Sequence, residues 1–163
     1  MNNIDVDKLL NECRQELDHV QSCIATLGIM SPVSPYLTKY AVIKACGTIE
    51  VSFKSLIADF CNKRSKKQVQ QFINWRIVKG SANPSHDNIR RLLGQFDENW
   101  KKAFQNNINT DPDKTHMIAS LESLVAARNE FSHGGNPTIS ITDVSNHFDY
   151  ARRVVQYIDG VVI

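Results

Sequence analysis

The chain has 163 residues, of which 42% are hydrophobic and 22% are charged, and its formal net charge is +2. This is the composition of a globular domain that can bury a core without disulfides or metal, and it excludes a disordered chain. The net charge is too small to predict nucleic-acid binding by itself, so any basic surface must be local. We expect residues 1–163 to form one domain.

The N-terminal stretch, the apolar runs and the cysteines predict the cellular compartment and whether a metal or cofactor is needed. The N-terminal stretch MNNIDVDKLL is acidic and has no apolar core of the signal-peptide kind. No apolar run approaches the ~20 residues of a membrane span. The cysteines, Cys13, Cys23, Cys46 and Cys61, show no C-x-x-C pair and no metal-type spacing with histidine. These features predict a soluble cytoplasmic protein with reduced thiols, no membrane contact, no metal and no cofactor.

The first half of the chain predicts two long helices and a short one. Apolar residues alternate at intervals of three and four over residues 6–27, with Asp5 as the expected N-cap and the prolines of 31–35 as the expected end. The pattern returns over 42–60 and closes on the cationic NKRSKK. A shorter apolar pattern predicts a helix over 67–79.

The second half predicts three further elements after a loop at 80–85, in which Ser85 is the expected cap of the next helix. One helix is expected to run through 89–104 and a polar loop over 105–114, with Asp111 and Pro112 opening the helix 111–133. A last helix is expected over 144–162. The fold class is therefore all-α, and of these helices we expect four main ones plus a short one to form the bundle.

The stretch AARNEFSHGG, residues 126–135, departs from this ordinary pattern. On a helical wheel of about 100° per residue, Arg128 falls in the middle of the apolar face of its helix, and Asn129 and His133 fall at the edge. A buried guanidinium needs a partner or water. Glu50, at the margin of the second helix's apolar face, is a candidate partner for a structural ion pair.

His133 admits two interpretations. It precedes Gly134-Gly135, so it can simply end the helix. Alternatively, a histidine that titrates near neutrality can move the proton of a ribose 2′-OH, while the planar fork of Arg128 binds phosphate oxygens. In that interpretation Arg128, Asn129 and His133 form a site that binds and cleaves a phosphodiester.

The segment RNEFSHG, residues 128–134, resembles the R-x4-6-H motif of the HEPN superfamily. Arg128 and His133 match its arginine and histidine, and Asn129 matches the polar residue that commonly follows the arginine. The chain length, the long first two helices with GTIEVSFKSLI in the second, and the helix after the motif resemble the RiboL-PSP type of HEPN domain. This resemblance covers nearly the whole chain.

The resemblance implies a homodimer in which two motif helices meet and form one RNase site without metal. Arg128 would bind the scissile phosphate of an RNA substrate, His133 would be general base or acid, Asn129 would position either, and Glu50 would orient Arg128. Many such proteins are toxins or anti-phage RNases encoded beside an antitoxin, so a cognate antitoxin is an expected partner. Gly135 stands where toxins silenced by a nucleotidyltransferase carry tyrosine, so that regulation is not expected.

Other basic and aromatic residues leave alternatives open. Lys63, Arg64, Lys66 and Lys67 are candidate RNA contacts, or else a solvated helix end. Trp75 and Trp100 are interpreted as core or interface residues. Two rival functions remain, namely a HEPN-like module that binds RNA or protein without cutting, and a structural adaptor in which Arg128 and Glu50 form a buried ion pair.

Overall fold

The computed structural model describes residues 1–63, 65–135 and 138–162 of the chain. These residues form seven α-helices and one π-helical turn and contain no strand, so the all-α fold class is confirmed. The elements are α1 (Ile4–Leu27), α2 (Ser34–Asn62), α3 (Lys67–Ile73), η1 (Asn74–Val78), α4 (His86–Phe96), α5 (Glu98–Thr110), α6 (Lys114–Ser132) and α7 (Ile141–Val161). The predicted number of helices, four main and one short, is too low.

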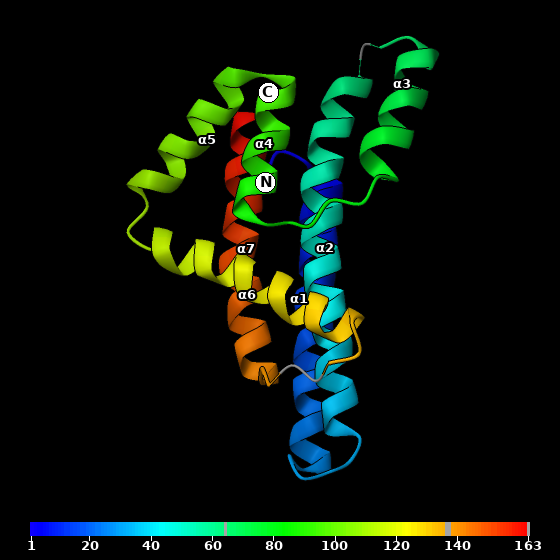
Figure 1. The fold of residues 1–163 in the computed structure, drawn as a ribbon, viewed down its shortest axis with the longest axis vertical. Coiled ribbons are helices and arrows are strands. Elements are labelled where there is room, and N and C mark those ends of the chain that lie inside the picture. Colours follow the sequence, from blue (N-terminus) through cyan, green and yellow to red (C-terminus); the bar gives the residue numbers. More distant parts are fainter. Residues whose placement is uncertain (64, 136–137, 163) are drawn as a thin grey trace.

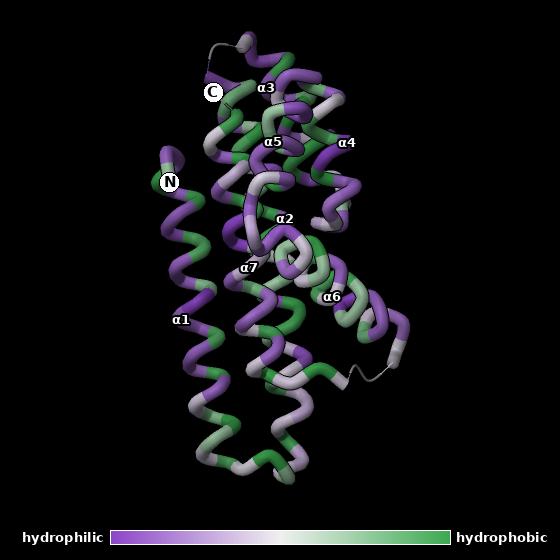
Figure 2. The backbone as a smooth tube through the Cα atoms, turned by 90° about the vertical axis from the view of Figure 1, so that its left-hand side faces the viewer, coloured by the Kyte–Doolittle hydropathy of each residue, from purple (hydrophilic) through white to green (hydrophobic). Residues whose placement is uncertain are grey.

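Three long helices, α1, α2 and α7, run side by side and set the long axis of the molecule (Figure 1). Helix α6 crosses α2 and α7 on the side opposite α1, and its C-terminal end projects away from these long helices (Figure 2). Helices α3 and η1 lie beside the C-terminal end of α2 (Figure 1). The motif helix is therefore outside the α1–α2–α7 layer.

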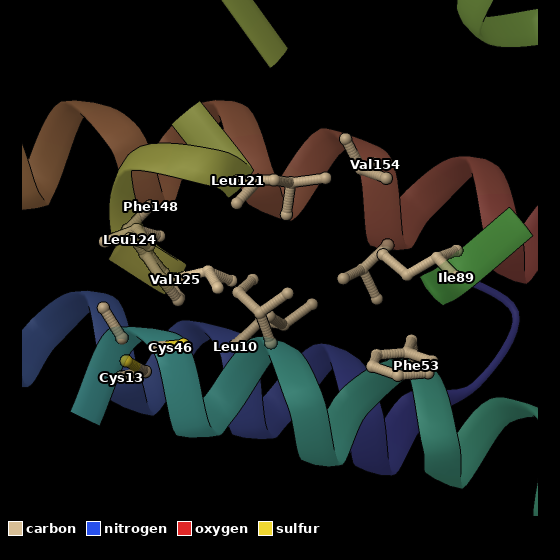
Figure 3. Close-up of a cluster of buried hydrophobic side chains, with 14 of the residues drawn as sticks. Leu10, Cys13, Cys46, Phe53, Ile89, Leu121, Leu124, Val125, Phe148 and Val154 are labelled. Atoms are coloured by element: carbon tan, nitrogen blue, oxygen red, sulfur yellow. The ribbon is translucent and has the colours of Figure 1, made fainter. Parts of the chain in front are cut away.

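The core lies where α1, α2, α4, α5, α6 and α7 converge, and the side chains labelled in Figure 3 come from all of these helices except α5. The apolar seam predicted for α1 is confirmed, since Leu10, Cys13 and Leu17 are completely buried. Burial of each such leucine-sized side chain is worth about 1.5–3 kcal/mol relative to exposure. The core thus fixes α6 against α2 and α7, the two long helices that it crosses.

The ends of α1 differ from the sequence predictions. The N-cap is Asn3 rather than Asp5, because the Asn3 Oδ1 accepts from the backbone N–H of Val6 at 3.0 Å. The helix ends at Gly28, whose φ of 86° favours glycine, several residues before the prolines that were expected to end it. Pro35 instead lies in the first turn of α2, where a proline costs no helical hydrogen bond.

The helix predicted over 89–104 is broken in two, and the prediction of one helix is wrong. Asp97 has an extended backbone and its carboxylate accepts from the N–H of Asn99 at 2.7 Å, which caps α5. The expected polar loop at 105–114 is also mostly helix, because Ile108 packs in the core. Helix α6 begins at Lys114 with Asp113 at the N-cap position, and Asp111 lies before it, where its carboxylate accepts from the Asp113 N–H at 2.8 Å and binds the Arg153 guanidinium at 2.7 Å.

Other local predictions have mixed outcomes. Ser85 caps α4 as expected, with its Oγ accepting from Asn88 N–H at 3.3 Å. The short helix at 67–79 exists, but of its apolar residues only Ile73 is buried. The four cysteines form no disulfide. None of the helices, within the described residues, is long and apolar enough to span a membrane.

Candidate functional site

Arg128 lies near the C-terminal end of α6 and is half-buried against neutral partners. Its Nη1 donates to Oδ1 of Asn83 at 2.7 Å and to Oδ1 of Asn129 at 3.4 Å. No carboxylate pairs with Arg128 among the described residues, and its Nε and Nη2 have no acceptor there. A guanidinium held by amides keeps its full charge, and the Nε–Nη2 edge is the fork that matches two phosphate oxygens.

Asn83 is the residue at this site that the sequence did not reveal. It lies in the loop at 80–85, and its own carbonyl accepts from the side chain of Asn88 on α4 at 3.2 Å. The preceding residue, Ala82, donates its N–H to Glu50 on α2 at 3.1 Å. An Asn-Pro pair in a loop is common, so only its distant contact with Arg128, 45 positions along the chain, marks it as a site residue.

Glu50 does not form the predicted ion pair with Arg128. Its carboxylate is 3.1 Å from Nζ of Lys54, one turn along α2, and both side chains are largely buried. Lys54 also donates to the carbonyl of Gly80. The charge of Glu50 is therefore neutralised within α2. Glu50 is linked to Arg128 only indirectly, because it binds Ala82 in the 80–85 loop and Asn83 of the same loop binds Arg128.

His133 ends α6 through its backbone and exposes its side chain. Gly134, with φ of 83°, donates to the Phe131 carbonyl at 3.0 Å, and Gly135 donates to the Glu130 carbonyl at 2.9 Å. This pair of bonds is a Schellman motif. The imidazole of His133 is exposed and makes no hydrogen bond with any residue that the structure describes. The capping interpretation therefore accounts for the backbone and leaves the ring available for chemistry.

The position of the missing tyrosine is sterically restricted. A Cβ added to Gly135 would lie 2.7 Å from Cγ of Glu130 and 3.0 Å from its carbonyl oxygen. A side chain at residue 135 would therefore require the exposed Glu130 side chain to turn away and the contact with the Glu130 carbonyl oxygen to relax by a few tenths of an ångström.

Cys46 lies in the electrostatic field of the site but is not a nucleophile. Burial raises the pKa of its thiol to about 11, and the nearby Arg128 charge lowers it only in part. A thiol with this pKa is protonated at neutral pH, and the thiolate is the reactive form. Cys46 is also only 1% exposed, so it is a core residue and not a candidate nucleophile.

The basic segment lies apart from Arg128. Lys63, Lys66 and Lys67 are exposed at the end of α2 and the start of α3, and Arg64 lies outside the described residues. From Glu50 to Lys63 the chain rises about 20 Å along α2 at 1.5 Å per residue. The structure thus brings Arg128 and Asn129 together with Asn83, and leaves the lysines on a separate part of the surface.

The comparison with protein families gives a clear result, because the profile of the RiboL-PSP-HEPN family matches residues 8–163. The chain belongs to this family. No curated protein and no solved structure gives a significant match. HEPN domains are generally RNase-related, and the RiboL-PSP-HEPN assignment agrees with the all-α fold. Within the described part of the chain, no three His, Cys, Asp or Glu side chains gather where they could hold a metal ion.

Proposed function

We propose that this RiboL-PSP-HEPN protein is a cytoplasmic, metal-independent endoribonuclease with a site shared by two copies of the chain, and that it acts as a toxin or anti-phage factor neutralised by a cognate antitoxin. The observation that carries the proposal is the half-buried guanidinium of Arg128, held at 2.7 Å by a neutral amide and with its Nε–Nη2 edge unused among the described residues. The structural alternative required an ion pair between Arg128 and Glu50, and Glu50 pairs with Lys54 instead.

In this mechanism each residue has a distinct task. Arg128 binds the scissile phosphate and stabilises the charge that develops on it. His133, whose imidazole is exposed, removes the proton of the 2′-OH or protonates the leaving 5′-oxygen. Attack by the 2′-oxygen on phosphorus then breaks the bond to the 5′-oxygen and leaves a 2′,3′-cyclic phosphate. Asn129, 3.4 Å from Arg128, steadies the arginine or the phosphate.

The geometry of α6 supports a site made by two chains. From Arg128 to His133 the helix advances about 7.5 Å and turns about 140°, so the two side chains leave one helix in different directions. A second α6 placed across a two-fold axis would bring the histidine of one copy toward the arginine of the other. The projecting C-terminal end of α6 is accessible for such a contact (Figure 2).

An exposed apolar stripe on α2 supplies a surface for the same dimer. Its members, Tyr36, Tyr40, Ile43 and Val51, are 71%, 45%, 45% and 49% exposed. The stripe reaches the motif helix, because Nζ of Lys39 lies 5.6 Å from the ring centre of Tyr36 and 5.2 Å from that of Phe131. Contiguous exposed apolar surface is typical of protein contacts.

The test is cleavage of single-stranded RNA by two variants. His133→Ala should abolish cleavage and leave fold and assembly unchanged, because its side chain is exposed. Arg128→Ala should also abolish cleavage, and activity of the parent should persist in EDTA. If one subunit supplies the arginine and the other the histidine, mixing the two variants should restore part of the activity.

The outcomes separate the proposal from its rival. A folded His133→Ala protein that cuts RNA at the parent rate contradicts the assignment. A parent protein that binds RNA without cutting it supports the non-catalytic module instead. Loss of activity on chelation, with recovery on adding one divalent ion, contradicts the metal-free mechanism.

A further inference from the structure

Residues 66–79, here called the arm, expose two aromatic rings while being firmly attached to the molecule. Phe72 is 59% exposed and Trp75 is 66% exposed, so of the two interpretations of Trp75, core or interface, the core one is wrong. The arm is anchored by the buried Ile73 and by Gln70, whose Nε2 donates to the carbonyls of Asn62 and Ser65, each at 3.1 Å. The two rings are three positions apart, with Phe72 near the end of α3 and Trp75 in the π-helical turn that follows it.

The arm belongs to a segment that is cationic throughout. Between Asp59 and Asp87 the sequence has six Lys or Arg residues and no Asp or Glu. Lys66, Arg76 and Lys79 are exposed and form no salt bridge with any described residue. Exposed aromatic rings can stack on the faces of nucleic-acid bases, and cations without a salt-bridge partner attract the phosphates. This combination is typical of surfaces that bind single-stranded nucleic acid.

A cationic cleft lies beside the arm, and one of its lining residues, Asn88, contacts the loop that holds Arg128. The cleft, of about 290 Å³, lies between η1, the 80–82 segment and α4, and Arg76 and Arg91 line it. Arg91 donates to the neutral Oδ1 of Asn88 at 3.0 Å and so keeps its charge. The same Asn88 holds the carbonyl of Asn83, the residue that contacts Arg128.

We propose that the arm is a stacking platform for single-stranded RNA. Unpaired bases stack on Phe72 and Trp75, phosphates lie against the arm's cations, and the strand continues through the cleft toward Arg128. This inference rests on the proposed RNase function, because it takes RNA as the polyanion at Arg128. It specifies the substrate further, since bases in a duplex are stacked on one another and cannot offer their faces to the arm.

The intrinsic fluorescence of Trp75 reports this contact without cleavage. The chain has two tryptophans, and Trp100 is only 8% exposed and packs edge-on against Phe60. In a Trp100→Phe variant, a 2′-O-methylated single-stranded oligonucleotide, which cannot be cut, should quench the remaining signal, and a duplex of the same sequence should not. Absence of quenching, or equal quenching by the duplex, overturns the inference. The parent protein gives the same readout over a constant Trp100 background if the variant does not fold.

Substitutions at Trp75 separate stacking from simple apolar contact. Trp75→Leu keeps an apolar side chain but loses the aromatic face, so the affinity for the 2′-O-methylated single strand should fall about tenfold or more, whereas Trp75→Phe should retain most of it. Ile4→Ala, at another exposed apolar residue, is the matched control and should bind as the parent does. Parent-like affinity in Trp75→Leu overturns the inference and leaves the arm as a surface for a protein such as an antitoxin.

The same measurements keep the two proposals apart. If His133→Ala loses cleavage but the single strand still quenches Trp75, both proposals are supported. If the parent cuts RNA but Trp75 is not quenched, only the platform is overturned. If the single strand quenches Trp75 but the parent does not cut RNA, the platform stands and the RNase function fails.

Discussion

Arg128 and Asn83 form a contact whose chemistry differs from that of a salt bridge. The 2.7 Å hydrogen bond from Nη1 satisfies one donor of the guanidinium without cancelling its charge. A carboxylate in place of the amide would bind Arg128 more strongly and would also repel a phosphate. The amide of residue 83 therefore holds the Arg128 side chain in place without reducing the affinity of the guanidinium for an anion.

Two substitutions at Asn83 test this balance. Asn83→Ala removes an acceptor from a half-buried charge and should cost about 1–3 kcal/mol of unfolding free energy, with reduced cleavage. Asn83→Asp should preserve or raise the unfolding temperature but reduce RNA cleavage at least as much as Asn83→Ala does. Thermal unfolding and a cleavage assay on both proteins check this. An Asn83→Asp protein as active as the parent would contradict the role given to the neutral amide.

His147 predicts a pH dependence of stability. Burial lowers the pKa of its imidazole from the ordinary 6.5, and the Asp143 charge opposes this in part. The folded state therefore prefers the neutral ring, whose Nδ1 lies 3.1 Å from the Ser120 Oγ. The resulting contribution to stability is complete above the ordinary pKa and is lost as the pH falls through 6.5 toward the lower pKa of the folded state.

We expect the denaturation midpoint to decrease when the pH is lowered from about 7.5 to about 5.5, and the decrease to be smaller in His147→Gln. His86, whose pKa is also lowered by burial, remains in the variant, so part of the dependence should persist. Urea titrations at the two pH values give the comparison. An unchanged pH dependence in His147→Gln would show that burial of this imidazole does not contribute.

At the scale of elements, the 80–85 loop connects the arm to the motif helix. Gly80 accepts from Lys54, Ala82 donates to Glu50 at 3.1 Å, and Asn83 accepts from Arg128 at 2.7 Å. The loop begins where η1 ends, with the N–H of Lys79 donating to the Asn74 carbonyl at 2.9 Å. Its position thus depends on the helical turn before it as well as on α2 and α6.

Gly80 permits this close connection. A Cβ on residue 80 would lie 2.3 Å from the carbonyl oxygen of Arg76, a backbone atom that cannot move alone. We expect Gly80→Ala to cost about 1–3 kcal/mol and to reduce cleavage, because the end of η1 and the loop must shift. Gly160→Ala, in α7 with nothing within 4 Å of the added Cβ, is the control and should stabilise by about 0.5–1 kcal/mol. Chemical denaturation of both variants measures these changes, and equal stability of the two would refute the close-contact argument.

At the scale of the whole molecule, the α2 stripe and the projecting end of α6 favour association of two chains through the motif side. The core side chains of α2, such as Cys46 and Phe53 in Figure 3, are buried, whereas the stripe residues of the same helix are exposed. Burying the stripe would remove apolar area from water, at about 25 cal/mol per Å². In the proposed dimer, the apolar stripe of α2 would therefore stabilise the interface and the end of α6 would supply the catalytic residues.

Ile43→Glu is the test of this dimer. A carboxylate in the middle of a buried stripe is strongly disfavoured, so the variant should be a monomer at micromolar concentration, with the fold intact and cleavage lost. Ile4→Glu places the same charge at a residue that is 79% exposed at the start of α1 and should remain a dimer. Light scattering distinguishes the two. A parent protein that is monomeric yet cleaves RNA would exclude a shared site.

The sequence alone determined the all-α class and the buried seams of α1 and α2, because helical periodicity is a local property, and it supplied Arg128, Asn129 and His133 as the site residues that we propose. It could not assign the partner of Arg128, since Glu50 and Asn83 were both compatible with every local pattern. The tertiary structure decided for Asn83, because Lys54 neutralises Glu50 and the loop from η1 to α4 passes over Arg128. Exposure of Trp75 was decided in the same way: an aromatic residue has the same periodicity inside a core or outside it, and only the packing of the arm against α2 leaves its ring in solvent.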